Sequence, residues 1–164
     1  MVQRGTRHRS GRPADGFTLI ELMMVVLVIS ILLLIAVPTF LGARKPAEDR
    51  HAQTILHSSL VAARTGSADT GDYAWVTPVA LQAEETSVVY LDGGTHARAT
   101  QNEVSVATGL YLGDTYVVLS SGSAAGRCFA VLATTTGAMQ YQAPALASCN
   151  ATAFDPAVGW ASTW

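Results

Sequence analysis

The sequence predicts an α+β fold in which one long N-terminal helix packs on an antiparallel meander sheet of four or five strands. Three observations lead to this prediction: a predominantly apolar stretch over residues 17–41, a following segment with helical periodicity, and five short β-rich runs in the C-terminal half. The 164 residues are enough for about one domain besides any targeting or membrane segment.

The apolar stretch from Phe17 to Leu41 has the length of a membrane span. As a helix, its 25 residues would reach roughly 37 Å, which exceeds the hydrocarbon thickness of about 30 Å. The four arginines before it outnumber the two cations that follow it, Arg44 and Lys45, so we expect the N-terminus in the cytoplasm. The exceptions to its apolar character are Thr18, Glu21, Ser30 and Thr39, with Pro38 as the one helix breaker.

Charged residues are distributed unevenly along the chain. Residues 1–16 carry four arginines against one acid, whereas residues 17–164 carry 6 basic and 11 acidic residues, a formal charge of −5. An acidic protein without a basic stripe lacks the electrostatic footprint of a nucleic-acid-binding protein. We therefore expect no direct binding of nucleic acid.

A basic segment followed by an apolar run is typical of a secretory signal peptide, of a permanent membrane anchor, and of a leader fused to an assembly helix. For a signal peptide the run is long, no small-residue cleavage site follows it, and Glu21 lies inside it. A plain anchor explains the length but not the acid, because a carboxylate within the bilayer costs a few kcal/mol unless it finds a partner.

Residues 16–22, Gly-Phe-Thr-Leu-Ile-Glu-Leu, and the apolar run with Pro38 resemble the N-terminal signature of type IV pilins and pseudopilins. The resemblance covers roughly residues 12–42. It implies a leader over residues 1–16, a membrane and filament-core helix over residues 17–42, and a globular pilin head over residues 43–164. It also implies that a prepilin peptidase cleaves after Gly16 and methylates the new N-terminus at Phe17. Asp15 departs from the family, because many members carry Lys or Arg before the glycine.

The resemblance also implies how the subunit assembles. Cleavage gives Phe17 a cationic amine one turn from Glu21. The partner of this glutamate is either the amine of its own subunit or, as the family model favours, the amine of a neighbouring subunit, which fixes the axial register. Pro38 either lets the helix unwind on entering the filament or marks a kink where the span ends.

The function implied is that of a structural subunit of a bacterial pilus for adhesion, motility or DNA uptake. Its partners would be other pilin subunits, the peptidase, and the assembly platform with its ATPase. The subunit would cross the cytoplasmic membrane first and lie on the cell surface after assembly. A pseudopilin or minor pilin of a type II secretion or competence system is one alternative, and a monomeric membrane-anchored extracellular binding domain is another.

After Gly42 an amphipathic pattern predicts a second helical stretch that continues the first, with a break near Pro46 and an end before Gly66. An irregular connection over residues 65–85 follows, with Tyr73, Trp75 and Val79 as packing anchors. The apolar or small positions expected on the sheet are Ala52, Ile55, Leu56, Ser59, Leu60 and Ala63.

Turn-forming residues separate the β-rich runs that we expect to form the sheet. The aromatic tail either covers the sheet edge or meets a neighbouring subunit. The expected strands are Ser87–Leu91, Val104–Thr108, Thr115–Ser120, Cys128–Ala133 and Met139–Gln142, and the tail aromatics are Phe154, Trp160 and Trp164.

Cys128 and Cys149 lie 21 residues apart, and they form a disulfide if this end is exported. The alternative is two unrelated buried thiols. No catalytic motif occurs, so we predict neither an enzyme nor a cofactor. No metal site is predicted either, because the spacing of neither the histidines nor the acids matches a metal-binding motif. Solvated side chains are therefore expected at His51, His57, His96, Glu84, Glu85 and Asp92.

Overall fold

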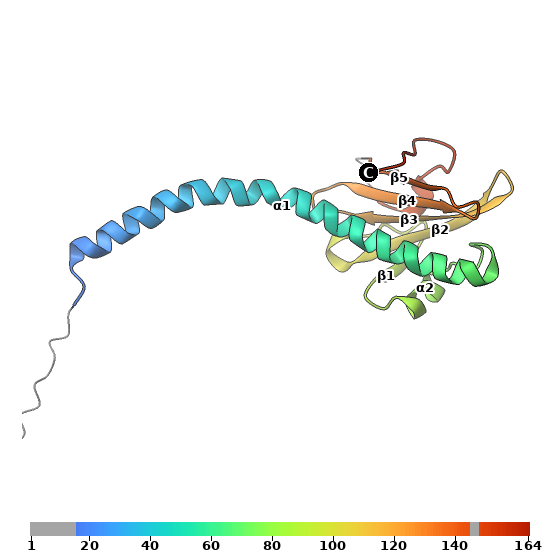
Figure 1. Ribbon diagram of the computed structural model, residues 1–164, viewed down its shortest axis with the longest axis horizontal. Helices are drawn as coiled ribbons and strands as arrows, with labels where there is room; N and C mark the ends of the chain where they lie inside the picture. The colour runs from blue at the N-terminus through green and yellow to red at the C-terminus, as the bar shows by residue number, and fades with distance from the viewer. Residues whose placement is uncertain (1–15, 145–147) are drawn as a thin grey trace, which may run out of the picture. The chain divides into compact units, whose positions relative to one another are not determined.

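The computed structural model describes residues 16–144 and 148–164 (Figure 1). Contacts divide the chain into two compact units with a boundary between Leu41 and Gly42, and each unit is described by itself. The elements are α1 Leu19–Thr70, α2 Pro78–Glu84, β1 Val89–Asp92, η1 Ala99–Gln101, β2 Glu103–Tyr111, β3 Asp114–Gly122, β4 Cys128–Thr134, β5 Met139–Gln142 and η2 Ala151–Ala153.

Helix α1 is longer and less interrupted than the sequence indicates. The expected break near Pro46 is wrong, because the helical assignment passes through both Pro38 and Pro46. A proline removes one backbone donor, and a long helix accommodates this loss by bending rather than ending. The expected end before Gly66 is also wrong, since α1 continues to Thr70.

Two glycines near the end of α1 have different roles. A Cβ at position 66 would overlap the six-membered ring of the Trp75 indole. Gly66 therefore leaves room for this ring and does not end the helix. The stop is Gly71, whose φ of 79° lies in the left-handed region that follows many helices. Its amide donates to the carbonyl oxygen of Ser67 at 2.8 Å.

The five predicted strands form one sheet in the order β1-β2-β3-β4-β5. Strands β2 to β5 pair antiparallel as expected, but β1 pairs parallel to β2, with Val89 opposite Glu103 and Asp92 opposite Val106. The purely antiparallel meander is therefore wrong at this edge. Residues 93–102 carry the chain back to the same end of the sheet, which a tight hairpin turn cannot do.

The amphipathic stripe of α1 packs on one face of the sheet (Figure 1). Ser59 lies within this apolar stripe because its hydroxyl donates to the Ile55 carbonyl oxygen at 2.9 Å and accepts from the Tyr90 hydroxyl at 3.1 Å. All six predicted positions are at least 92% buried, namely Ala52, Ile55, Leu56, Ser59, Leu60 and Ala63.

The connection over residues 65–85 is not wholly irregular, because it contains α2. Thr77 caps this helix by accepting a hydrogen bond from the Ala80 amide at 3.2 Å, and Pro78 occupies the first turn. Leu81 is fully buried, whereas Val79 is 81% exposed. Val79 is therefore not a packing anchor, since residues two apart on a helix face different directions.

The opposite face of the sheet carries a smaller core around the disulfide and η2. The tail then crosses the free edge of β5, where Ala161 bridges to Tyr141 by two backbone hydrogen bonds of 2.8 and 3.0 Å. Trp164 ends the chain against Phe129 and Tyr141, with ring centroids 5.2 and 4.8 Å apart. The tail thus covers the sheet edge, one of the two alternatives open from the sequence.

Candidate functional site

The N-terminus of α1 is built around a reciprocal cap. Thr18 precedes the first helical residue, and its hydroxyl oxygen accepts from the Glu21 amide at 3.3 Å. The carboxylate of Glu21 in turn accepts from the Thr18 amide at 3.4 Å and from the Thr18 hydroxyl at 3.1 Å. These contacts satisfy two donors that a helix start otherwise leaves unpaired.

Sequence reasoning missed this capping box, although the signal is present as Thr-x-x-Glu directly before an apolar run. Its consequence is that Glu21 has hydrogen-bond partners within its own chain. The carboxylate also points back toward Phe17, because Thr18 lies directly after that residue. The cap supplies no positive charge, so pairing of Glu21 with a cation stays a prediction.

Gly16 and Phe17 lie before the helix, outside any regular element. Phe17 is 82% exposed, and a Cβ added to Gly16 would meet no atom within 4 Å. Among residues 16–144 and 148–164, nothing places a steric demand for glycine at position 16. A demand for glycine there has to come from outside the chain.

The apolar half of α1 is exposed from Leu19 to Phe40. Within the described part of the chain, α1 is the one helix that is long and apolar enough to cross a membrane. Its hydroxyl groups bond to the helix itself: Ser30 donates to the Val26 carbonyl oxygen at 2.7 Å, and Thr39 donates to that of Ala36 at 2.8 Å. Between Leu19 and Phe40, the one charged side chain is Glu21.

Pro38 lies within α1, and its missing amide leaves a gap in the hydrogen-bond ladder one turn after Leu34. Thr39 places a hydroxyl donor beside this gap, 3.2 Å from the Ile35 carbonyl oxygen. The helix thus continues past the proline, and the Thr39 hydroxyl bonds to the carbonyl oxygen next to the one that loses its amide donor. Unwinding at Pro38 on assembly stays a prediction.

The two cysteines form a disulfide, Cys128–Cys149, with Cα atoms 5.3 Å apart. His96 is attached to it, because its Nδ1 accepts from the Cys149 amide at 2.6 Å. The Cys149 carbonyl oxygen accepts from the Ala97 amide at 2.8 Å. The disulfide therefore joins β4, the segment before η2, and the long loop between β1 and β2.

A buried carboxylate lies beside this junction. Glu103 is 3% exposed, and its two oxygens accept from the Arg98 amide at 2.7 Å and from the guanidinium at 3.1 and 3.3 Å. Burial opposes ionisation, but these hydrogen bonds, together with the positive charge of Arg98, outweigh it and lower the pKa of Glu103.

The histidines lie apart from one another. His51 Nε2 is 3.0 Å from the Asn102 side-chain oxygen, His57 lies against the Tyr141 ring, and His96 bonds to Cys149. Across residues 16–144 and 148–164, no three His, Cys, Asp or Glu side chains gather as metal ligands would.

Residues 12–37 match the family model of the prokaryotic N-terminal methylation motif, which is the type IV pilin and prepilin signature. This confirms the resemblance seen in the sequence, and it supports a type IV pilin-like or pseudopilin protein. The family that carries this signature is structural and not enzymatic. No curated protein and no solved structure matches the chain.

Proposed function

We propose that this chain is a prepilin whose leader, residues 1–16, is removed between Gly16 and Phe17, and whose helix over residues 17–42 joins those of other copies in a filament core. Residues 43–164 form the head on the filament surface. The observation that carries the proposal is the exposed apolar helix next to the methylation motif, because nothing in the described chain covers those side chains. A membrane covers them before assembly and neighbouring helices cover them afterwards.

Glu21 links processing to assembly. In the uncleaved chain the nitrogen of Phe17 belongs to a neutral peptide bond, whereas cleavage turns it into a cationic amine next to the cap. Thr18 already directs the carboxylate toward this end of the helix. In a helix bundle with little water, an unpaired carboxylate is expensive, so each subunit is held where an amine meets its neighbour's Glu21.

The remaining parts of the proposal follow from this mechanism. The prepilin peptidase cuts and N-methylates Phe17, and an assembly platform with its ATPase draws the subunit out of the cytoplasmic membrane. The arginine-rich leader keeps the N-terminus in the cytoplasm until cleavage, and the head lies outside. The helix has the length and composition for such a position.

The test of assembly separates the charge of Glu21 from its capping role. Glu21→Gln keeps an oxygen that accepts from Thr18, since glutamine also completes a capping box, but it removes the charge. We expect Glu21→Gln to lower the yield of sheared filaments at least tenfold while the processed subunit accumulates in the membrane. The measurement is immunoblotting of both fractions.

Thr18→Ala is the matched control, because it removes the cap and keeps the charge. We expect this variant to form filaments at close to the wild-type level, with a cost of about 1 kcal/mol to the helix start. Wild-type filament yield from Glu21→Gln would overturn the role of the charge. A wild-type chain that is processed and never found in filaments would favour the monomeric anchored domain.

A further inference from the structure

The loop between β2 and β3 has an unusual residue at its tip. Leu112 and Gly113 form a two-residue hairpin turn between the paired residues Tyr111 and Asp114, with φ angles of 52° and 93°. Turns with two such angles strongly favour Asn-Gly or Gly-Gly, because a side chain with a Cβ is crowded there. Leu112 thus occupies a position where a side chain with a Cβ strains the backbone.

The strained leucine does not pack on its own chain. Leu112 is 88% exposed, Leu110 is 74% exposed, and Tyr111 between them is 37% exposed. These three residues, called the apolar tip below, present apolar surface at the end of a hairpin. Neither backbone preference nor internal packing accounts for Leu112, so an external contact is the remaining physical reason for it.

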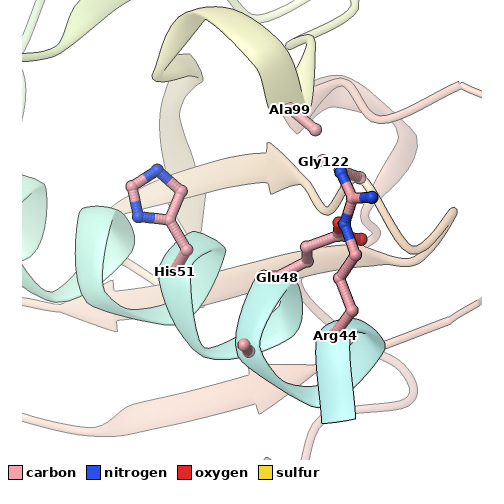
Figure 2. A pocket seen from close by; sticks show the side chains of 7 residues that line it. Arg44, Glu48, His51, Ala99 and Gly122 are labelled. Carbon is pink, nitrogen blue, oxygen red and sulfur yellow. The ribbon is translucent and has the colours of Figure 1, made fainter. Parts of the chain in front are cut away.

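A hollow of about 280 Å³ lies at the other end of the same unit (Figure 2). Most of the residues that line it are small. The side chains of Arg44, Glu48 and His51 on α1 form one side of the hollow, and Ala99 and Gly122 lie on the opposite side. It exceeds the roughly 150 Å³ at which an apolar cavity holds a benzene molecule. The full lining is Arg44, Ala47, Glu48, His51, Ala99, Gly122 and Ala124.

The apolar tip and the hollow lie at opposite ends of the sheet. Strand β3 starts beside the tip at Asp114 and ends at the hollow with Gly122, so its nine residues separate them by roughly 30 Å. The tip of one chain therefore cannot fill the hollow of the same chain. It has the position to fill the hollow of another.

Charge distinguishes the two ends as well. Arg44, Arg98 and Arg127 near the hollow are each paired with a carboxylate, while Lys45 and Arg50 have no ion-pair partner within residues 16–144 and 148–164. The tip end carries carboxylates without a cation partner in the same described ranges. These are Asp69 near the end of α1, Asp72 just after it and Asp114 in the hairpin, and the one cation on this last part of α1 is Arg64.

We propose that the apolar tip of one copy docks in the hollow of a second copy, so that successive heads contact each other tip to hollow. This inference rests on the proposed filament and specifies its head contact. The occupant is a second copy because the described part of one subunit carries both an apolar tip near unpaired carboxylates and a hollow near two unpaired cations, Lys45 and Arg50. Such a contact joins two different surfaces, which is the arrangement that builds open helical assemblies.

Leu112→Asn tests the tip, because asparagine suits the left-handed turn and removes the aliphatic group. We expect Tm of the purified full-length chain to rise by roughly 2 to 4 °C and filament yield to fall about tenfold. Val79→Asn is the matched control, since Val79 is 81% exposed on α2 and away from both surfaces, and its yield should stay at the wild-type level. Wild-type yield from Leu112→Asn would overturn the proposal.

Cross-linking tests the pairing directly. Cells that express both Leu112→Cys and Ala124→Cys variants are treated with a short bis-maleimide, and the sheared filaments are analysed by denaturing electrophoresis. We expect a covalent dimer, and none from the matched pair Val79→Cys and Ala124→Cys. Filaments without the expected dimer overturn the contact and leave the proposed function intact. A wild-type chain that forms no filaments overturns the proposed function and this contact with it.

Discussion

At the scale of single residues, Glu103 shows how a buried carboxylate is kept charged. Burial alone would raise its pKa, but the amide and guanidinium of Arg98 bind both oxygens and the net effect is a lowered pKa. The carboxyl therefore binds a proton less readily in the folded chain than in the unfolded one. Its contribution to stability is full above the unfolded pKa of about 4.3 and is lost as pH falls through the lower folded value.

The lowered pKa of Glu103 predicts how the stability of the fold depends on pH in acid. The free energy of unfolding of the wild type should fall between about pH 5 and pH 3, and Glu103→Gln should fall less steeply over the same window. Glu84→Gln, at an exposed position on α2, should retain the wild-type slope. Chemical denaturation at a series of pH values measures the slopes, and equal slopes for wild type and Glu103→Gln would contradict the assignment.

Glu21 combines two roles that the sequence presents as one. Its position four residues after Phe17 indicates the assembly charge, and its position three residues after Thr18 completes a helix cap. The cap explains how a carboxylate at the start of an apolar helix is held in one orientation before any partner arrives. The charge is the property that glutamine lacks, and on this basis we expect Glu21→Gln to fail in the proposed filament.

At the scale of secondary-structure elements, the end of α1 shows that side-chain packing can oppose intrinsic helix propensity. Gly66→Ala should stabilise an isolated helix by up to about 1 kcal/mol, but in this fold the added Cβ meets the Trp75 ring. We expect Gly66→Ala to lower Tm of the full-length chain. Gly42→Ala, also helical and with open space around the added Cβ, should leave Tm unchanged or raise it.

Thermal unfolding in detergent, followed by near-ultraviolet circular dichroism, makes this comparison. The two substitutions are chemically identical, so a difference in sign reports on surroundings and not on helix propensity. A rise in Tm from Gly66→Ala as large as that from Gly42→Ala would show that the Trp75 ring moves aside freely and that the space left by Gly66 has no structural role.

Features with a local signal were predictable, and features that depend on distant contacts were not. The stripe from Ala52 to Ala63 follows the helical period, and Met139–Gln142 has the predicted bounds because turn formers flank it. The parallel pairing of β1 depends on the path of residues 93–102, which composition does not reveal. Gly66 looked like a helix end because its packing partner, Trp75, lies beyond the helix.

The candidate site divides in the same way. Its residues near Phe17 and Glu21 follow from a motif in consecutive positions. The capping box of Thr18 and Glu21 is equally local in sequence. It was missed because only the charge of Glu21 was considered, and not its ability to accept hydrogen bonds at the start of the helix. The hollow could not be predicted, since it combines α1, the loop before β2 and the loop after β3.

At the scale of the whole molecule, successive segments of the sequence differ in charge and in apolar character. The first 16 residues carry positive charge, residues 17–41 carry apolar surface, and the rest carries a core, a disulfide and most of the acids. The disulfide closes a loop with a separation of 21 residues, which contributes on the order of 3 kcal/mol by loop entropy. A small head gains much from such a link.

This difference between segments gives cleavage between Gly16 and Phe17 a specific consequence. The proposed cleavage would remove the excess positive charge from the N-terminus and leave one amine there, on the residue before the Thr18–Glu21 cap. Because Gly16 has open space around it, the fold itself tolerates a larger residue at this position. Gly16→Ala should therefore leave the Tm of the head unchanged while blocking removal of the leader, and Gly42→Ala should be processed like the wild type.

The intact mass of the subunit isolated from cells tests the central claim most directly. We predict a wild-type mass that corresponds to residues 17–164 with one methyl group on the nitrogen of Phe17, and a Gly16→Ala mass that retains the leader. A wild-type chain that keeps Met1, or one that begins beyond Leu41, would contradict the account.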